Sequence, residues 1–426
     1  MAAILIAALS PVGHIEPLLA VAADQVERGN TVTVLTGASH SEAIRSVGAT
    51  PHPLPPIADF DDQQFDAAMR GRASPLKAMN EAIVRLFLRP MPHQAAELSR
   101  VLAEHRCDAI IADYGFFGVL PMLLGDPAER PPVLYYTPTP LMLSSRDTAP
   151  NGLGLAPGSP LRNRALTVLS QRILLRRAQN AANATLKTLG RPPLPVFLLD
   201  CGRLADRMIV PTVPDFEYPR SDLPAHVRFV GAVHPRKSIG FRLPPWWHEL
   251  DGDRPVVHVT QGTVDNADLS RLIEPTIAAL AAEPVTVVVT TCGGTLSGPV
   301  PANTHVADFL PHDVLLPRVD VIVTNGGYGA VQRAVACGVP MVVAGSTEDK
   351  PEVAARVAWS GAGLNLRTGT PDPAMVRAAV REVLDDDRYL RRARELETAF
   401  ARRDGLAEIA VMLDEVIAER HLSSSR

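Results

Sequence analysis

Two residues at the ends of apolar segments have side chains that could move a proton. His14 ends the turn Ser10-Pro11-Val12-Gly13-His14, which follows the apolar run Ala3 to Leu9, and Asp113 ends a second apolar run, Ala109 to Ala112. If both runs are parallel strands of one sheet, both side chains lie at its carboxyl edge, where open α/β sheets bind ligands. His14 could then take a proton from a hydroxyl group while Asp113 orients the ring. The alternative is that each residue only caps the helix that follows it.

A glycine-rich turn in the second half of the chain has the composition of a phosphate-binding loop. The apolar run Val319 to Val323 leads into Thr324-Asn325-Gly326-Gly327-Tyr328-Gly329-Ala330, and a helical pattern continues to Ala336. Small residues let the backbone approach a phosphate, and the N–H groups at a helix start favour its negative charge. A second turn, Gln261-Gly262-Thr263, follows the apolar run Val256 to Thr260 and could add donors to the same phosphates. The alternative is that tight strand-to-helix turns need glycine for steric reasons alone.

Two acidic segments are candidate binding loops of different kinds. Ser346 to Glu352 follows an apolar strand, and its carboxylates Glu348 and Asp349 could bind the hydroxyls of a sugar, unless they only favour the start of the next helix. Asp59-Phe60-Asp61-Asp62 imitates an Asp-x-Asp metal motif, but we expect a solvated loop or a helix cap there and no metal site. The four cysteines form no Cys-x-x-Cys pair and predict neither disulfides nor a zinc site.

The elements that must position these residues alternate between apolar runs and helical patterns, which predicts an α/β protein. A strand–helix–strand unit opens the chain, with the helix expected from Pro17 to Arg28. A loop rich in proline and glycine is expected from Pro138 to Pro160, a linker from about Pro214 to Trp247, and a helical end from Tyr389 to Glu419. The expected strands are Ala3 to Leu9, Thr31 to Leu35, Ala109 to Ala112, Val133 to Tyr136, Val256 to Thr260, Val285 to Thr291 and Val319 to Val323.

Length and composition limit the possible classes of protein. A chain of 426 residues is too long for one hydrophobic core and predicts two domains. A hydrophobic content of 46% with a net charge of -4 argues against a disordered chain or a nucleic-acid partner. The first nine residues lack the basic leader and cleavage site of a signal peptide, and no apolar run approaches the ~18 residues that span a bilayer. We therefore expect a cytoplasmic protein without stable membrane insertion.

With these motifs in view, the chain resembles the inverting glycosyltransferases that decorate small molecules, and above all the bacterial macrolide and antibiotic glycosyltransferases. Gly13-His14-Ile15-Glu16-Pro17 and Arg28-Gly29-Asn30-Thr31-Val32-Thr33 are similar to the family's Gly-His-x-x-Pro start and its second strand. The stretch from Asp320 through Gly338-Val339-Pro340 to Glu348-Asp349 is similar to the family's donor-binding segment in order and spacing. The similarity covers almost the whole chain.

The resemblance implies a GT-B fold, in which two Rossmann-like doubly wound domains face each other across a cleft. The acceptor would bind to the first domain and the donor to the second, and the last helix would cross back to the first domain. The expected parts are an acceptor-binding domain over 1–215, a linker over 216–250, a nucleotide-sugar-binding domain over 251–395 and a C-terminal helical segment over 396–426.

The resemblance also implies roles for single residues. His14 would be the general base and Asp113 its partner, while Phe309 would stack on the nucleobase with His312 beside it. The co-substrate would be a nucleotide diphosphate sugar, with no other cofactor. The expected donor-binding residues are Gln261, Gly262, Thr263, Phe309, Leu310, His312, Asn325, Gly326, Gly327, Tyr328, Gly329, Ala330, Glu348 and Asp349. The expected acceptor-binding residues are Phe60, Phe87, Tyr114, Phe116, Phe117 and Met142, of which a part must belong to the core.

Four positions depart from the family pattern. Asn325 stands where a histidine usually meets the diphosphate, and Arg333 stands where a glutamate commonly binds the ribose. Ala330 replaces a common serine and Lys350 a common glutamine. These changes leave the choice between UDP and TDP, and the identity of the sugar, open.

The function predicted from these features is metal-independent transfer of a hexose, with inversion, from a UDP- or TDP-sugar to a hydroxyl of a small apolar acceptor. Such an acceptor would be a macrolide, a polyketide or a phenolic natural product, and the protein would be a monomer or a homodimer. A nucleotide-sugar epimerase of the same architecture, which would convert the donor with no acceptor, is one alternative. A non-catalytic protein of this fold that binds a nucleotide sugar or another transferase is the other.

Overall fold

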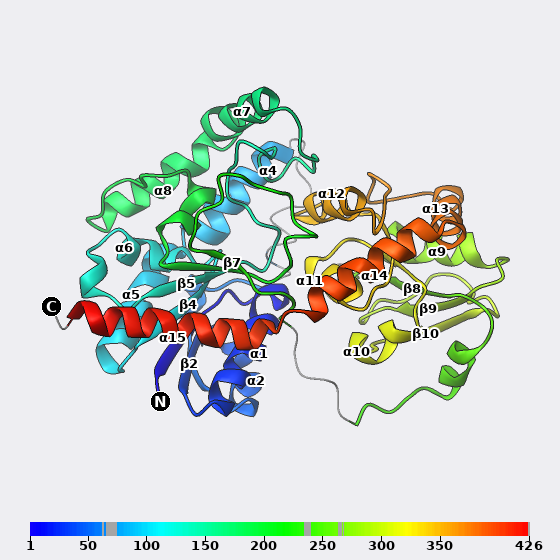
Figure 1. Cartoon of the computed structure of the whole chain (residues 1–426), viewed down its shortest axis with the longest axis horizontal. Helices are drawn as coiled ribbons and strands as arrows, with labels where there is room; N and C mark the ends of the chain where they lie inside the picture. The colour runs from blue at the N-terminus through cyan, green and yellow to red at the C-terminus, as the bar shows by residue number, and fades with distance from the viewer. Residues whose placement is uncertain (62–63, 65–74, 234–239, 263–265, 267, 425–426) are drawn as a thin grey trace.

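The computed structural model describes residues 1–61, 64, 75–233, 240–262, 266 and 268–424, which form two lobes (Figure 1). Each lobe is built on its own parallel sheet with helices packed against it. The strand order is β3-β2-β1-β4-β5-β6-β7 in the N-terminal lobe and β10-β9-β8-β11-β12-β13 in the C-terminal lobe. In both sheets the order reverses beside the first strand of the lobe, which is the doubly wound arrangement predicted from the sequence.

The N-terminal lobe places its most apolar strands at the centre of the sheet. Every residue of β4 and β5 is buried, as expected for parallel strands covered on both faces. Its strands are β1 Ala3–Ala7, β2 Thr31–Thr36, β3 Thr50–Pro53, β4 Ala109–Asp113, β5 Val133–Tyr136, β6 Arg207–Val210 and β7 Val227–Phe229. Its helices are α1 Val12–Glu27, α2 Ser41–Ser46, α4 Pro75–Ala82, α5 Met91–Glu104, α6 Leu120–Leu123, α7 Pro160–Leu169 and α8 Arg176–Thr188.

The C-terminal lobe repeats this plan with one strand fewer among the described residues. Its strands are β8 Val256–Thr260, β9 Thr286–Thr290, β10 Thr304–Ala307, β11 Val321–Thr324, β12 Met341–Val343 and β13 Gly363–Asn365. Its helices are α9 Ile273–Leu280, α10 His312–Leu315, α11 Tyr328–Ala336, α12 Lys350–Ser360, α13 Pro373–Asp385 and α14 Asp387–Ala401. None of the helices in the described part of the chain is long and apolar enough to cross a membrane.

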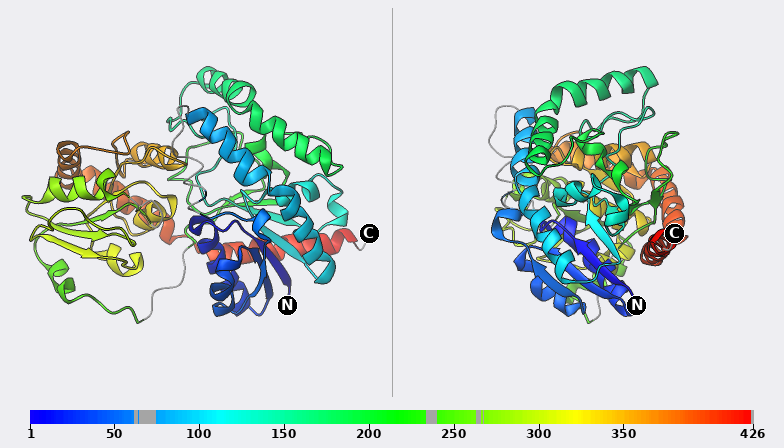
Figure 2. Two further views of the ribbon diagram at one scale, coloured as in Figure 1. Left: turned by 180° about the vertical axis from the view of Figure 1, so that it is seen from behind. Right: turned by 90° about the vertical axis from the view of Figure 1, so that its left-hand side faces the viewer.

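The final helix, α15 Gly405–Ser424, returns to the N-terminal lobe (Figures 1 and 2). Ile409, Leu413 and Val416 are buried in the same apolar cluster as Ile4 of β1 and Ala109 of β4. The helix is therefore part of the N-terminal core although it follows the whole C-terminal lobe in the sequence.

The structure differs from the expected elements in three places. The first helix begins at Val12 rather than Pro17, so His14 lies in its first turn and Pro17 lies inside it. The helical end is two helices, α14 and α15, separated by residues 402–404. Strand β7 falls within the stretch 216–250 that we interpreted as linker, and it extends the N-terminal sheet. Strands as short as β7, or as rich in proline as the edge strand β3, have too little pattern to be predicted.

Candidate active site

The two residues predicted to handle a proton meet at the carboxyl edge of the N-terminal sheet. Nδ1 of His14 lies 2.7 Å from Oδ2 of Asp113. The His14 side chain is 23% exposed and Asp113 is fully buried. Because a carboxylate can only accept hydrogen bonds, Nδ1 carries the ring proton and the lone pair belongs to Nε2. This is the tautomer that a histidine needs to act as a base through Nε2.

Asp113 is held in place by the backbone as well as by the histidine. Its Oδ2 accepts a hydrogen bond from the N–H of Leu9 at 3.2 Å, and its Oδ1 accepts one from the N–H of Gly115 at 3.1 Å. The first donor follows β1 and the second follows β4, so the pairing of these two strands places the carboxylate. The dyad is therefore built on two central strands and is rigidly oriented.

The glycine-rich turn leads from β11 into α11 and leaves the first turn of that helix without a side-chain cap. Gly326 has φ +87°, and a Cβ there would lie 2.8 Å from a methyl group of Val343, so only glycine fits. Gly329 is exposed and Ala330 is half-buried. The N–H groups at this helix start can therefore bind an anion.

Asn325 ties the two predicted phosphate turns together. Its Nδ2 donates to the carbonyl oxygen of Gln261, and its Oδ1 accepts from the N–H of Gly327 at 3.2 Å. Asn325 is only 5% exposed. Asn325 thus links the two turns by hydrogen bonds.

The helix starts α1 and α11 face each other where the lobes meet. Glu16 of α1 and Arg333 of α11 form an ion pair of 3.6 Å between the lobes. A cavity of about 70 Å³ lies beside this pair, and Gly13 of one lobe and Tyr328 and Gly329 of the other line it. The helix start that carries His14 and the predicted phosphate turn, which are more than three hundred residues apart in sequence, therefore border the same cavity between the lobes.

The acidic loop before α12 also comes near His14. Asp349 is half-buried and Glu348 is exposed with φ +57°. Burial raises the pKa of the Asp349 carboxyl to about 6; the Glu348 carboxylate acts in the same direction, while the Lys350 ammonium and the His14 imidazole act against it. The ammonium of Lys350 pairs with Glu348. The carboxyl group of Asp349, which lies near His14 of the other lobe, therefore changes its charge near pH 6.

The predicted nucleobase contacts lie before and at the start of α10. Phe309 is 60% exposed, which leaves its ring open to stacking, whereas Leu310 is 2% exposed and belongs to the core. The ring of His312 lies 5.5 Å from that of His258 in β8, edge to face. Burial lowers the pKa of His258 to about 4, so this ring stays neutral near pH 7. We did not predict His258 from the sequence, because inside an apolar strand it carries no pattern of its own.

Gln261 is used inside the C-terminal lobe. Its Oε1 accepts the N–H groups of Leu272 and Ile273, both at 3.0 Å, at the start of α9, and its Nε2 donates to Asp268. The Gln261 side chain is only 1% exposed and caps the start of α9. Gly262 is half-buried with φ +81°. Thr263 lies outside the described residues.

The residues predicted to bind the acceptor lie in different surroundings. Phe60, Phe87 and Phe117 form a cluster of rings, whereas Tyr114 and Phe116 lie in the core. Phe87 is half-buried and contacts Phe60 and Phe117, with ring centroids 5.3 Å and 6.1 Å away. Phe116 is fully buried, and Tyr114 donates its hydroxyl hydrogen to the carbonyl of Leu199. Met142 is half-buried against the same core, on the loop after β5. Phe87 and Met142 thus retain surface that a ligand can reach.

The aspartate-rich segment makes one long-range and one local hydrogen bond, so Asp59 is neither a solvated side chain nor a helix cap. Asp59 accepts a hydrogen bond from Ser10, and Asp61 accepts one from the N–H of Gln64 at 2.8 Å. Asp62 lies outside the described residues. Across the described ranges, no group of three or more histidine, cysteine or acidic side chains is placed to hold a metal ion.

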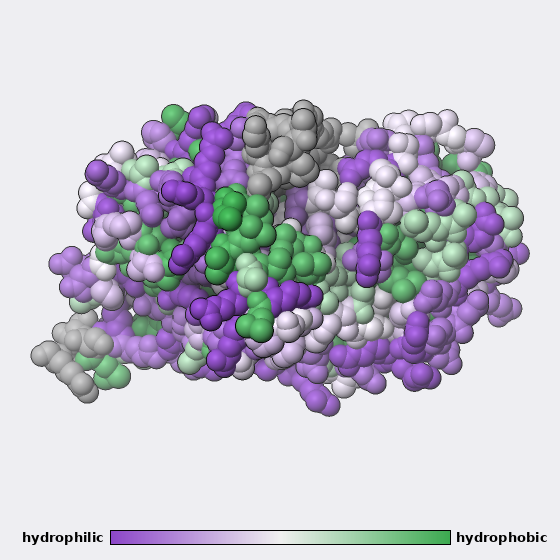
Figure 3. All heavy atoms as spheres, turned by 90° about the horizontal axis from the view of Figure 1, so that it is seen from above, coloured by the Kyte–Doolittle hydropathy of each residue, from purple (hydrophilic) through white to green (hydrophobic). Residues whose placement is uncertain are grey.

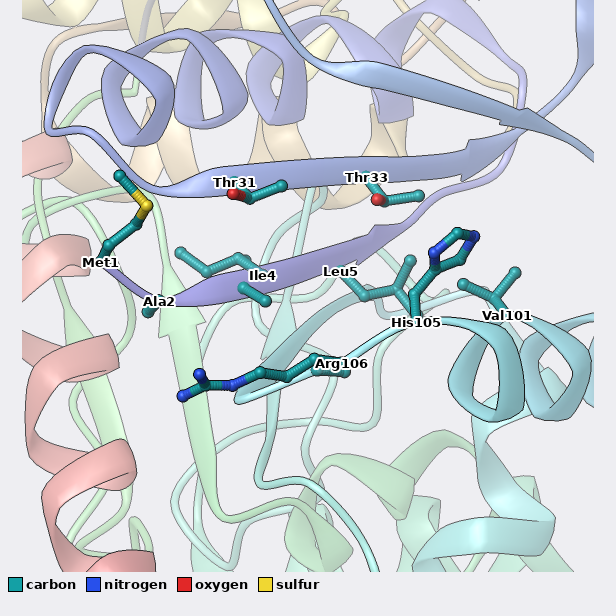
Figure 4. A pocket seen from close by; sticks show the side chains of 11 residues that line it. Met1, Ala2, Ile4, Leu5, Thr31, Thr33, Val101, His105 and Arg106 are labelled. Atoms are coloured by element: carbon teal, nitrogen blue, oxygen red, sulfur yellow. The ribbon is translucent and has the colours of Figure 1, made fainter.

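A larger cavity, of about 310 Å³, lies at the opposite end of the N-terminal sheet (Figure 4). Ala3 of β1, Thr31 of β2 and His105 before β4 line it, at the amino ends of these strands. Because His14 and Asp113 lie at the carboxyl ends, this cavity is separate from the candidate active site.

Exposed apolar side chains gather on the upper face of the molecule, where Figure 3 shows a hydrophobic patch. Large apolar residues are also exposed in the loop before α7, in α7 and just after it; they are Leu153, Leu155, Leu161, Val168, Leu169 and Ile173.

Comparison of the chain with known proteins shows the family to which it belongs. Residues 273–416 match the family model described as the C-terminal domain of erythromycin biosynthesis protein CIII-like proteins. The chain is 40% identical to 4'-demethylrebeccamycin synthase of Lentzea aerocolonigenes, over 98% of this chain and 100% of that protein. It is 37% identical to UDP-glycosyltransferase 2 of Phaeomoniella chlamydospora, over 97% and 96% of the two chains. The crystal structure of the kitacinnamycin glycosyltransferase superposes with a TM-score of 0.75 at 23% identity, covering 97% and 99%.

Two doubly wound lobes with this strand order define the architecture as GT-B. The chain belongs to the family of small-molecule glycosyltransferases that includes the bacterial macrolide and antibiotic glycosyltransferases. It is a glycosyltransferase, as the sequence predicted.

Proposed function

We propose that this glycosyltransferase moves a hexose from a UDP- or TDP-sugar to a hydroxyl of a small apolar natural product, such as a macrolide, a polyketide or a phenol, with inversion at the anomeric carbon. The observation that carries the proposal is the position of the His14–Asp113 dyad opposite the uncapped start of α11. The similarity to 4'-demethylrebeccamycin synthase and to a UDP-glycosyltransferase supports natural-product acceptors and a nucleotide sugar donor.

The proposed reaction is a single displacement. The acceptor oxygen forms a bond to the anomeric carbon and gives its proton to Nε2 of His14, while the bond from that carbon to the diphosphate oxygen breaks. Asp113 stabilises the imidazolium, and the nucleoside diphosphate leaves with the bonding electrons. The N–H groups at the start of α11 meet the charge on the leaving group, so the route requires no metal ion.

The first test is binding of UDP, TDP, GDP and ADP, measured as a shift in melting temperature, because a ligand of the native state stabilises it by mass action. We expect a selective shift with UDP or TDP. The matching glucose-carrying donor is then incubated with umbelliferone, a small phenol, with and without EDTA. We expect a glycoside of inverted anomeric configuration by NMR in both cases.

Other outcomes would contradict the proposal. Conversion of the donor with no acceptor would favour an epimerase, and the absence of any nucleotide shift would favour a non-catalytic protein. Loss of transfer in EDTA would overturn the metal-free route, and a glycoside of retained configuration would overturn the single displacement.

The raised pKa of Asp349 predicts how donor binding depends on pH. In the proposed complex its ionised carboxylate accepts hydrogen bonds from sugar hydroxyls. Protonation below its pKa of about 6 removes the negative charge and turns one of its two acceptor oxygens into a donor, which weakens this contact. We expect KM for the donor to rise by about tenfold between pH 7 and pH 5, in line with the ionised fraction of such a group.

Asp349→Asn supplies the control for this pH effect, because an amide does not titrate but still offers an acceptor oxygen. Its donor KM should be nearly flat over the same range. An equal rise in donor KM in the variant would assign the pH effect to another group.

A further inference from the structure

Four charged side chains, Arg356, Glu217, Glu352 and Arg220, are buried together where α12 meets the N-terminal lobe, and Arg220 lies 3.8 Å from Glu217. Arg356 and Glu217 are each 1% exposed, and Glu352 is 3% exposed. The Arg356 guanidinium donates to Glu217 through Nε at 2.8 Å and to Glu352 through Nη1 at 2.9 Å. It also lies 4.4 Å from the ring centroid of Tyr218. Glu217 lies between β6 and β7, so this buried cluster joins the two lobes.

The same cluster holds the loop between β5 and α7, residues 137–159, at two separate places. Near the start of the loop, the N–H of Leu141 donates to Glu217 at 3.2 Å, and Arg220 donates to the Leu141 carbonyl at 2.8 Å. Further along, the N–H groups of Gly152 and Gly154 donate to Oε1 of Glu352 at 2.9 Å and 2.7 Å. Glu352 therefore divides its two oxygens between Arg356 and the loop.

Close packing reinforces the second contact. Gly154 has φ +60°, and a Cβ there would lie 2.9 Å from Cβ of Pro351 and 3.0 Å from its carbonyl oxygen. Pro351 lies in the first turn of α12, two residues after Asp349. The loop that carries Met142 thus rests on the helix that begins next to the proposed sugar-binding carboxyl.

We infer that Glu352 and Arg356 are positioning residues for the transfer reaction: they hold the loop of residues 137–159 against α12, and so set the acceptor surface of one lobe relative to the donor site of the other. This inference rests on the proposed function, in which Asp349 binds the donor, and on the expectation that Met142 of the loop contacts the acceptor. A buried charge left without its partner is strongly unfavourable, so the cluster favours one docked arrangement of the loop over a range of partly detached ones.

The test begins with Glu352→Ala, which removes the acceptor for two loop N–H groups. Hydrogen exchange of peptides that span residues 147–156 is measured by mass spectrometry, and we expect it to become faster. With umbelliferone as acceptor, we expect its KM to rise on the order of tenfold, which corresponds to the loss of hydrogen bonds to a charged group. The Kd for UDP, which requires no loop contact, should stay within about twofold.

Two further variants separate positioning from general stability. Glu352→Gln keeps an oxygen that can accept hydrogen bonds from the N–H groups of Gly152 and Gly154. Its KM for the acceptor should therefore stay close to the wild-type value. Gly154→Ala changes no charged residue: its new methyl group meets Pro351, so it should displace the loop and raise the acceptor KM while Arg356 and Glu352 stay paired. Arg392→Ala is the matched control, because Arg392 bonds to Asp215 of the other lobe at 3.3 Å and to Ser360 and Glu395, but not to the loop.

The outcomes distinguish this inference from the proposed function. If wild-type protein fails to glycosylate any acceptor, the proposed function fails, while the exchange measurement still reports on the loop. Unchanged exchange in Glu352→Ala would overturn the anchoring, and faster exchange with unchanged acceptor KM would overturn the positioning role. If Glu352→Ala does not fold, as shown by the loss of a melting transition, Gly154→Ala decides by the same two measurements.

Discussion

Replacement of His14 by alanine is expected to lower kcat/KM for transfer to an alcohol acceptor by about 10²–10⁴-fold, the usual contribution of a positioned general base. The alanine cannot take the acceptor proton, and the hydroxyl of a neutral alcohol is a poor nucleophile. Donor binding should change little, because the proposed diphosphate contacts come from α11. Steady-state kinetics with umbelliferone, beside a Kd for UDP, measure both effects.

His93→Ala is the matched control, since His93 is exposed on α5 of the same lobe. It should leave both quantities unchanged. Asp113→Asn should reduce kcat/KM as well, because an amide can present its NH₂ group to Nδ1 and favour the wrong tautomer. Full transfer by His14→Ala would show that another group accepts the proton.

Replacement of Arg356 by methionine is expected to reduce the free energy of unfolding by about 3–5 kcal/mol, the cost of leaving the buried carboxylate of Glu352 without its ion-pair partner. Methionine has a similar length, so the packing volume is largely kept, while Glu352 loses its counter-charge and Glu217 keeps only Arg220, 3.8 Å away. Urea denaturation followed by circular dichroism measures this change.

Arg381→Met serves as its control, because Arg381 is 61% exposed and pairs with Glu283 at the surface of the C-terminal lobe. An exposed pair of this kind is worth at most about 1 kcal/mol. Combining Arg356→Met with Glu352→Gln removes one positive and one negative charge, leaves Glu217 paired with Arg220, and should recover part of the lost stability. If Arg356→Met alone is as stable as wild type, the cluster does not hold the lobes together.

The features that the sequence predicted have local or repeated signals. Central strands such as Ala109 to Ala112 are continuous apolar runs, and the glycine turn after β11 has a composition that few other structures require. His14 and Asp113 could be paired in advance because both end a central strand, and the carboxyl ends of adjacent parallel strands meet. Their contact of 2.7 Å agrees with that reasoning.

The features that escaped prediction depend on long-range packing. Glu217 and Arg356 are 139 residues apart in the chain, and nothing in either local sequence marks them as buried partners. Gln261 looked like a ligand contact because it lies in a glycine turn, yet its amide caps α9. The start of α1 was placed too late because Pro17 suggested a first helical position, whereas the helix passes through it.

The return of α15 has a consequence for how the protein is made. The helix covers Ile4 and Ala109, whose strands leave the ribosome long before it does. During synthesis the apolar surface of the N-terminal lobe that α15 covers therefore stays exposed until the complete C-terminal lobe has been translated. The C-terminal lobe, by contrast, is a continuous insertion within the N-terminal lobe and can fold on emergence. The lobe that is synthesised first is thus the lobe that is completed last.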